Sequence, residues 1–238
     1  MIESLAAPGR VLRIVSARFA VCLLAALPLS AQTLADVYAK MDASSQSFKA
    51  MTADIKQTAH TAVVNDDSTE FGIIRLKRAK GNDTRILVDF TRPEPKTVSI
   101  DGGKVSMLLP KAKTVQNYDL RAKKAALEQG MLLGFGASGA DVQAAYDVTL
   151  VGKEAIAGQP TSHIHLVPKS KEVLQNLKSA DLWISDSLGA PVQQKFITTS
   201  GGDYTLIQYS NMKINPSIAD KDLKLSVPKG FQVQEIGK

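Results

Sequence analysis

The sequence predicts an α+β fold in which one large, curved antiparallel sheet carries helices against one face. Some ten or eleven segments alternate apolar and polar residues as strands do, with turn residues between them. Most of these segments follow one another directly, without the crossover helices that a parallel sheet needs. Helical patterns are confined to the start of the chain, to residues 120–145 and to one short connection at 170–178.

The N-terminal segment has the organisation of a secretory signal peptide. Arg10, Arg13 and Arg18 precede an apolar run of about a dozen residues, which is too short to span a bilayer as a helix. Small residues end this run at Ala31, where we expect cleavage, with an uncleaved anchor as the alternative. The remainder, residues 32–238, is expected to be a single soluble domain in the periplasm, with 1–31 removed as the signal peptide.

Composition excludes several classes of function. Cys22, the single cysteine, lies inside the signal segment after Val21 rather than after a small residue, so lipid attachment is not expected. The mature chain then has no disulfide and no thiol nucleophile. The formal charge of +6 is spread along the chain without interleaved aromatic residues, which argues against a nucleic-acid surface.

Periodicity defines the expected elements. Leu34, Val37, Tyr38 and Met41 recur at helical spacing and predict a helix within residues 33–50. Residues 121–132 and 139–146 favour helix by propensity, as does the short connection at 170–178. The expected strands are 52–59, 70–78, 84–93, 96–100, 105–110, 113–120, 146–157, 160–169, 179–185, 190–200 and 203–215.

The clearest local signal is a hairpin at residues 96–110. Its two arms alternate apolar residues on either side of the turn Asp101-Gly102-Gly103. Because side chains alternate across a strand, the apolar members of both arms should share one face of the sheet, although an error of one residue would reverse that face.

Residues 131–142 contain the pattern G-x-G-x-x-G at Gly134, Gly136 and Gly139, with Glu154 about twenty residues on, as a dinucleotide fingerprint requires. That fingerprint needs a strand before it and a βαβ unit around it, and neither is expected here. Two other interpretations stay open: a flexible glycine connection, or a movable hydrophobic lid.

Catalytic and metal chemistry find little support. His163 and His165 lie two residues apart on a predicted strand and could bind zinc together, but only His60 remains as a third histidine. Ser138 does not lie in a nucleophile elbow. We therefore expect no enzyme activity, no metal and no cofactor, with an exported hydrolase or zinc protein as the second alternative function.

Arg78 is the unusual charge of the sheet. It stands in phase with Ile74 and Leu76, on the apolar side of the strand, whereas Arg75 and Lys77 alternate with them. Either the strand has ended and Arg78 is solvated, or Arg78 is a cation at the rim of a cavity that donates hydrogen bonds to backbone carbonyls of a lid.

Four stretches resemble the LolA family of periplasmic outer-membrane lipoprotein carriers and LolA-like lipid-binding proteins. They are SFKAMTADIKQT (47–58), GIIRLKR (72–78), RPEPKTVSIDGGKVSMLLP (92–110) and ADLWISDSLGAPVQQKF (180–196). Their order and spacing cover nearly all of residues 33–235.

The resemblance implies an unclosed half β-barrel with helices across its concave face, and a hydrophobic cavity that shields acyl chains. It places the family's lid-locking arginine at Arg78. The side chains expected to line the cavity are Ile74, Leu76, Val98, Ile100, Met107 and Leu109 from the sheet, and Met131, Leu132 and Phe135 from the lid.

The expected function is transport of lipoproteins from the inner to the outer membrane by a monomer. The implied partners are acyl chains of lipoproteins, an inner-membrane lipoprotein-releasing transporter and an outer-membrane acceptor. The first alternative is a LolA-like module that binds or senses another lipid.

Overall fold

The computed structural model describes residues 33–78, 84–123 and 133–237. The residues from Gln32 to Lys238 form one compact unit. Its strands are β1 (Ala50–Thr61), β2 (Asp66–Arg78), β3 (Thr84–Arg92), β4 (Lys96–Asp101), β5 (Lys104–Leu109), β6 (Thr114–Asp119), β7 (Tyr146–Ile156), β8 (Gln159–Pro168), β9 (Leu177–Ser185), β10 (Pro191–Thr198), β11 (Tyr204–Ile214) and β12 (Gln232–Ile236). The helices are α1 (Leu34–Ser47), η2 (Arg121–Lys123), α3 (Gly139–Ala145), α4 (Lys171–Leu174) and η3 (Asp220–Leu223).

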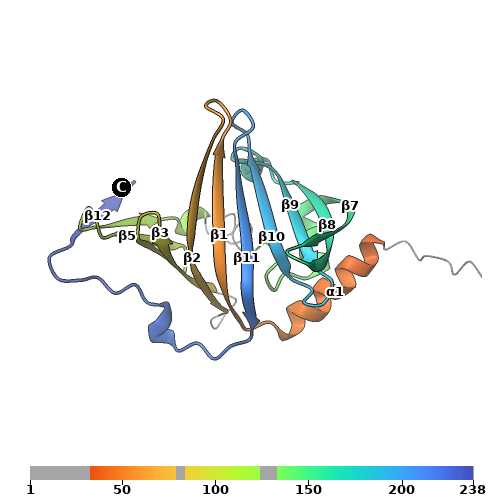
Figure 1. The fold of residues 1–238 in the computed structure, drawn as a ribbon, viewed down its shortest axis with the longest axis horizontal. Coiled ribbons are helices and arrows are strands. Elements are labelled where there is room, and N and C mark those ends of the chain that lie inside the picture. The colour runs from red at the N-terminus through yellow and green to blue at the C-terminus, as the bar shows by residue number, and fades with distance from the viewer. Residues whose placement is uncertain (1–32, 79–83, 124–132, 238) are drawn as a thin grey trace, which may run out of the picture. The chain divides into compact units, whose positions relative to one another are not determined.

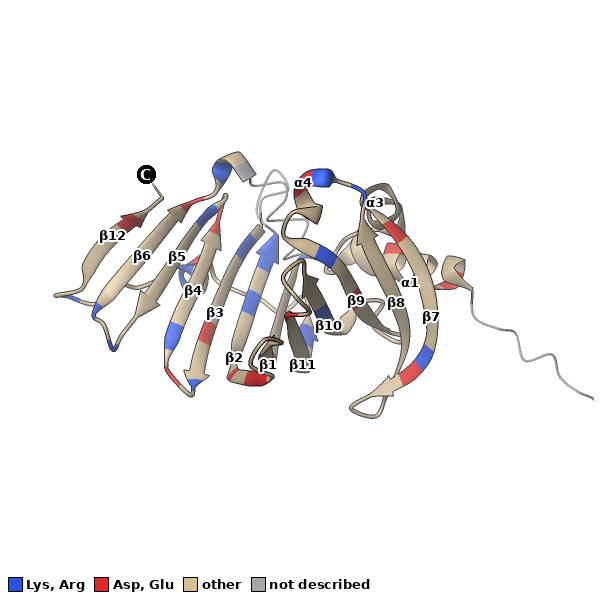
Figure 2. Ribbon diagram, turned by 90° about the horizontal axis from the view of Figure 1, so that it is seen from above, with Lys and Arg blue, Asp and Glu red and all other residues tan. Residues whose placement is uncertain are grey.

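The described strands form a single sheet in the order β12-β6-β5-β4-β3-β2-β1-β11-β10-β9-β8-β7. From β6 to β7 every neighbouring pair is antiparallel, as the sequence predicts. A twelfth strand, β12, lies near the C-terminus and pairs with β6 in parallel. Figure 1 shows the long strands β1, β2 and β11 at the middle of the sheet, and Figure 2 shows the sheet bending around toward β7.

The predicted hairpin is β4–β5. Gly102 and Gly103 have φ values of 58° and 81°, and positive φ at both central residues is what a two-residue type I′ turn requires. Val98 pairs with Met107 across this hairpin, so the two side chains share one face of the sheet.

The two faces of the sheet differ in character, because side chains alternate along each strand. One face, which we call the inner face, carries a continuous row of apolar residues. Across the strands, Ile55 is in register with Gly72 and Tyr209, and Ile74 with Val88. The opposite, outer face carries charged pairs such as Arg75 with Asp89, whose Nη1 and Oδ2 atoms are 2.5 Å apart.

Helices and one loop cover part of the inner face. We call residues 34–48 and 133–145 the lid. Thr33 caps α1 in a capping box with Asp36, which satisfies backbone donors at the start of the helix. Val37 and Met41 of α1 are fully buried against β8 and β9. The lid therefore covers the inner face mainly at the β7–β9 end.

The lid is connected within itself by hydrogen bonds. The Gly139 amide donates to Asp42 Oδ1 at 2.7 Å and so joins α3 to α1. Ser138 and Asp141 form a capping box at the start of α3, and these hydrogen bonds from Ser138 lower the pKa of Asp141. The helix expected at 121–132 begins as η2, and its remainder lies outside the described residues.

The chain after β11 crosses the outer face, which the sequence did not indicate. Asn215 accepts hydrogen bonds from the Lys49 and Ala50 amides and donates to the Ser47 carbonyl, at 2.7, 3.2 and 2.8 Å. Ile218 and Leu223 then pack on Leu87 to form a small outer core. Asn215 thus joins the end of α1 to the end of β11, and the chain then crosses the outer face on its way to β12.

Candidate functional site

The inner face holds an apolar cavity of about 380 Å³ beside the lid. Strands from β1 to β3 and from β9 to β11 supply its walls. Its lining residues are Ile55, Gln57, Ile74, Ile86, Val88, Leu177, Gln194, Phe196, Thr205, Ile207 and Tyr209. Aliphatic side chains dominate this list, so the cavity offers a surface that water wets poorly and hydrocarbon contacts favourably.

Two polar side chains in the cavity wall already have hydrogen-bond partners. Gln194 donates to the Leu133 carbonyl at 2.5 Å and accepts from the Tyr209 hydroxyl at 2.6 Å. Burial raises the pKa of Tyr209 above its usual range, so this phenol is neutral and only donates and accepts hydrogen bonds. These groups hold the lid to the sheet rather than form an acid–base pair.

Residues 133–138, at the start of the second lid segment, form a loop that we call the lid loop, and this loop packs against the cavity region. Leu133 and Phe135 are buried, and the Phe135 ring meets the Tyr209 ring edge-on with 5.1 Å between centroids. Gly134 and Gly136 between and beside them have φ values of 85° and 67°. Positive φ at these two glycines turns both large side chains toward the sheet.

Arg78 lies where β2 ends against the lid. Its guanidinium donates to the Gly136 carbonyl through Nη2 and to the Ser45 carbonyl through Nη1, the latter at 3.4 Å. The same guanidinium lies 5.6 Å from the centroid of the Phe48 ring. Arg78 therefore contacts the end of α1 and the lid loop at once, as a planar group with several donors can.

The structure places the remaining predicted residues on the inner face in three settings. Ile74 lines the cavity. Leu76, Ile100 and Phe135 are buried in the cluster beneath the lid, and Val98 packs against the same cluster. A separate pocket farther along the face is lined by Met107 and Leu109. Met131 and Leu132 lie outside the described residues.

Sequence reasoning missed most of the cavity wall. Ile55 and Ile86 alternate within predicted strands, so their periodicity could have found them. Gln194 is in phase with Val192 and Phe196, but it stands between Gln193 and Lys195 in a polar run. Its role therefore depends on the lid that covers it, which the local pattern does not encode.

The glycine pattern does not form a dinucleotide site. Gly134 and Gly136 lie in the lid loop, and Gly139 begins the seven-residue helix α3. The strands that flank this region, β6 and β7, are not neighbours in the sheet, so they form no βαβ unit around the pattern. Glu154, the acidic position of the pattern, accepts a hydrogen bond from the Trp183 indole on the outer face.

The two histidines of β8 belong to a hydrogen-bonded cluster on the outer face. The Nε2 atom of His163 and the Nδ1 atom of His165 lie 3.1 and 2.8 Å from the same Asp181 oxygen. His163 also stacks on Trp183, with ring centroids 4.3 Å apart. Across the described ranges, no three His, Cys, Asp or Glu side chains are grouped so that they could hold a metal ion.

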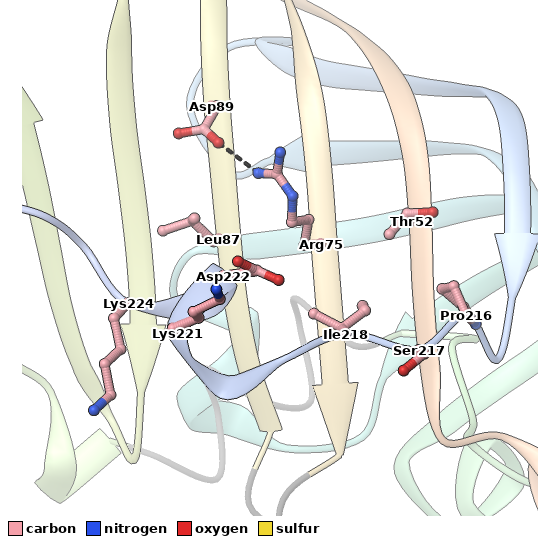
Figure 3. A pocket seen from close by; sticks show the side chains of 10 residues that line it. All are labelled: Thr52, Arg75, Leu87, Asp89, Pro216, Ser217, Ile218, Lys221, Asp222 and Lys224. Carbon is pink, nitrogen blue, oxygen red and sulfur yellow. Dashed lines mark hydrogen bonds and ion pairs between the residues drawn. The ribbon is translucent and has the colours of Figure 1, made fainter.

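A polar pocket of about 490 Å³ lies on the outer face, between β1–β3 and the segment after β11 (Figure 3). It is larger than the apolar cavity of the inner face. Its lining is polar, with Arg75, Asp89, Lys221, Asp222 and Lys224 around it. Figure 3 shows Arg75 directed toward Asp89 within this polar pocket. This lining suits water and ions, whereas the inner cavity suits hydrocarbon.

An apolar cavity on one face of an unclosed, helix-covered sheet is the geometry of a site for hydrophobic ligands. The chain belongs to the LolA family, described as "Outer membrane lipoprotein carrier protein LolA", which it matches over residues 46–226. The family description names a carrier of outer-membrane lipoproteins. None of the helices in the described ranges combines the length and apolarity needed to cross a membrane.

Solved structures show the same fold at low sequence identity. An uncharacterised conserved protein of Thermus thermophilus is 12% identical with a TM-score of 0.53, over 86% of this chain and 99% of that chain. MucB is 13% identical with a TM-score of 0.51, over 81% of this chain. This chain spans 62% of the MucB chain. No curated protein sequence matches the chain.

Proposed function

We propose that this protein is a periplasmic carrier that shields the acyl chains of lipoproteins and moves them from the inner to the outer membrane. The observation that carries the proposal is the apolar cavity of about 380 Å³ beside the lid. One acyl chain exposed to water costs on the order of 12 kcal/mol, at ~0.8 kcal/mol per methylene. A lipoprotein that crosses an aqueous compartment therefore needs such a cavity.

Loading and release require that the lid open at low cost. In this proposal Arg78 is the gate, because its guanidinium joins the Ser45 and Gly136 carbonyls of the two lid segments. The loading partner is an inner-membrane lipoprotein-releasing transporter, and the receiving partner is an outer-membrane acceptor. Residues 1–31 direct export as a signal peptide, and the mature chain, residues 32–238, acts as one domain and as a monomer.

The test is binding and transfer of a lipoprotein with a matched pair of variants. Ile207 lines the cavity, whereas Leu206, the preceding residue, faces the outer side of the same strand. Ile207→Trp fills the cavity and should abolish release of lipoproteins from inner-membrane vesicles into the soluble fraction. Leu206→Trp should leave release intact. Equal release by both variants, with both folded by circular dichroism, would rule out this cavity as the carrier site.

A second candidate function keeps the fold and changes the ligand: a LolA-like module that binds or senses another lipid. MucB, which shares the fold, has also been crystallised in complex with MucA(peri). The mainly aliphatic lining of the cavity favours no particular head group. Mass spectrometry of lipids that co-purify with the exported protein distinguishes the two, because a free glycolipid would favour this candidate over the lipoprotein carrier.

A further inference from the structure

An ion pair between Glu70 and Lys96 lies on the inner face next to the apolar cavity. Glu70 is in register with Gln57, which lines the cavity, and Lys96 is in register with Phe90 of the buried inner cluster. The Nζ atom of Lys96 lies 2.7 Å from Glu70 Oε1 and 2.9 Å from Glu70 Oε2. The Lys96 and Glu70 side chains are only 24% and 20% exposed, so this pair is largely removed from solvent on a face otherwise suited to hydrocarbon.

The ion pair also borders the separate inner-face pocket that Met107 and Leu109 line, which we call the rim pocket. This pocket of about 400 Å³ is lined by Glu70, Glu94, Pro95, Lys96, Met107, Leu109, Lys111 and Ala112. Because Gln57 and Glu70 are direct neighbours across β1 and β2, the ion pair stands between the apolar cavity and this rim pocket. A ligand that filled both would pass over Lys96.

The chemistry of Lys96 leaves a donor for such a ligand. An ammonium group has three N–H donors and no acceptor. Within the ranges that the structure describes, the Glu70 carboxylate is the hydrogen-bond acceptor of Lys96, and the Phe90 ring lies 4.8 Å from Nζ. Desolvating a lysine is unfavourable unless its donors are used, so a ligand acceptor at this position would be bound strongly.

We propose that Lys96 donates a hydrogen bond to the ester carbonyls that join acyl chains to a polar head, and that Glu70 positions Lys96 for this contact. This subsite rests on the proposed function. The acyl chains occupy the apolar cavity, the ester groups meet Lys96, and the head group leaves over the rim pocket. The pair selects acylated, ester-bearing lipids over hydrocarbon chains of equal length.

The test compares two ligands with wild-type protein by fluorescence titration. One is a dipalmitoyl lipopeptide, and the other is its diether analogue, which has the same chains and peptide but no ester carbonyls. Wild type should bind the diester about ten-fold more tightly, because hydrogen bonds to charged groups are worth more than neutral ones. Equal affinities would overturn the subsite. Binding of neither ligand would instead contradict the proposed function.

Two double variants test whether the preference for the diester comes from the Glu70–Lys96 pair. Glu70→Gln with Lys96→Met removes both charges together and so leaves no buried charge without a partner. It should lose the preference for the diester while its affinity for the diether stays within about two-fold of wild type. Glu94→Gln with Lys111→Met is the matched control, because that pair borders the same pocket but is 67% and 83% exposed. A preference that survives in the first variant, or is lost in the control, would overturn the assignment to Lys96.

Discussion

The Gln194 side chain donates a 2.5 Å hydrogen bond to the backbone carbonyl of Leu133, and this contact joins the floor of the cavity to its lid. Gln194 is 1% exposed, and its other amide atom accepts from Tyr209. Arg78 holds the same lid loop three residues on, at Gly136. The described lid loop is therefore fixed at two points by side chains of the sheet, and between them Phe135 packs on Tyr209.

Replacing Gln194 should loosen the lid and lower the stability of the fold. Gln194→Met leaves the Leu133 carbonyl and the Tyr209 hydroxyl without their partner, and an unsatisfied buried polar group costs about 1–3 kcal/mol. The free energy of unfolding from urea titration measures this loss. The adjacent Gln193→Met is the control, since Gln193 faces the outer side and accepts from Gln208. An equal loss in both variants would contradict the role given to Gln194.

Removing the Arg78 guanidinium should speed the exchange of bound lipid and leave the sheet intact. Arg78→Leu loses the contacts to the Ser45 and Gly136 carbonyls, and we expect the dissociation rate of a bound acyl probe to rise roughly ten-fold. Arg75→Leu, on the outer face of the same strand, should leave that rate unchanged. Stopped-flow release of the probe measures both, and identical rates in wild type and Arg78→Leu would remove Arg78 as a gate.

Gly136 should tolerate no side chain. A Cβ at this position would lie 2.7 Å from Arg78 Nη2 and 2.7 Å from Phe48 Cδ1, and the φ of 67° is strained for alanine by roughly 1–2 kcal/mol. Gly102→Ala shares the positive φ in open space and reports the backbone strain alone. Gly136→Ala should therefore lower the melting temperature more than Gly102→Ala. A smaller or equal decrease would show that the lid loop adapts to the added methyl group.

Acid should weaken the attachment of α1 to the sheet. Burial alone would raise the pKa of Asp186, but hydrogen bonds from Lys40 of α1, Lys153 and Ser162 outweigh it and lower that pKa to about 2. A carboxyl group with a lowered folded-state pKa stabilises the fold above its unfolded pKa of about 4, and this stability is lost as the pH falls toward 2. A pKa lowered from about 4 to about 2 corresponds to at most ~2.7 kcal/mol, and solvent screening reduces this contribution.

Asp186→Asn tests this pH dependence. The variant should be less stable than wild type at pH 6, and the difference between them should shrink between pH 4 and pH 2. Urea titrations at several pH values measure it. A difference that stays constant across this range would mean that the Asp186 carboxylate does not contribute through its charge.

The sheet could be predicted because its strands carry their periodicity in the sequence. Val98 and Met107 alternate in phase around a turn whose positive φ values favour glycine, and the structure pairs them. Strand β12 could not be predicted with the same certainty, because all five of its residues are exposed and it is held through backbone pairing with β6. A strand without a buried face leaves no hydrophobic pattern to find.

The sequence could predict which face of the sheet holds the site, but not which residues of that face line the cavity. Period two places Ile74, Leu76 and Ile100 on one side, but it does not say which of them the lid covers. Leu76 and Ile100 are buried under Phe48 and Phe135, whereas Ile74 reaches the open cavity. The contacts of Gln194 depend on a loop sixty-one residues away in the chain, which no local pattern encodes.

The most direct test of the account is whether acyl chains enter the inner cavity. Two adjacent isoleucines of β2 provide the test position and its control. Ile74 lines the cavity, whereas Ile73 is 39% exposed on the outer face. A photoreactive phenylalanine derivative at each position, irradiated with a dipalmitoyl lipopeptide, is analysed by mass spectrometry. The account predicts crosslinks to the acyl chains from position 74 and none from position 73. Crosslinks from position 73 alone, or equally from both, would contradict it.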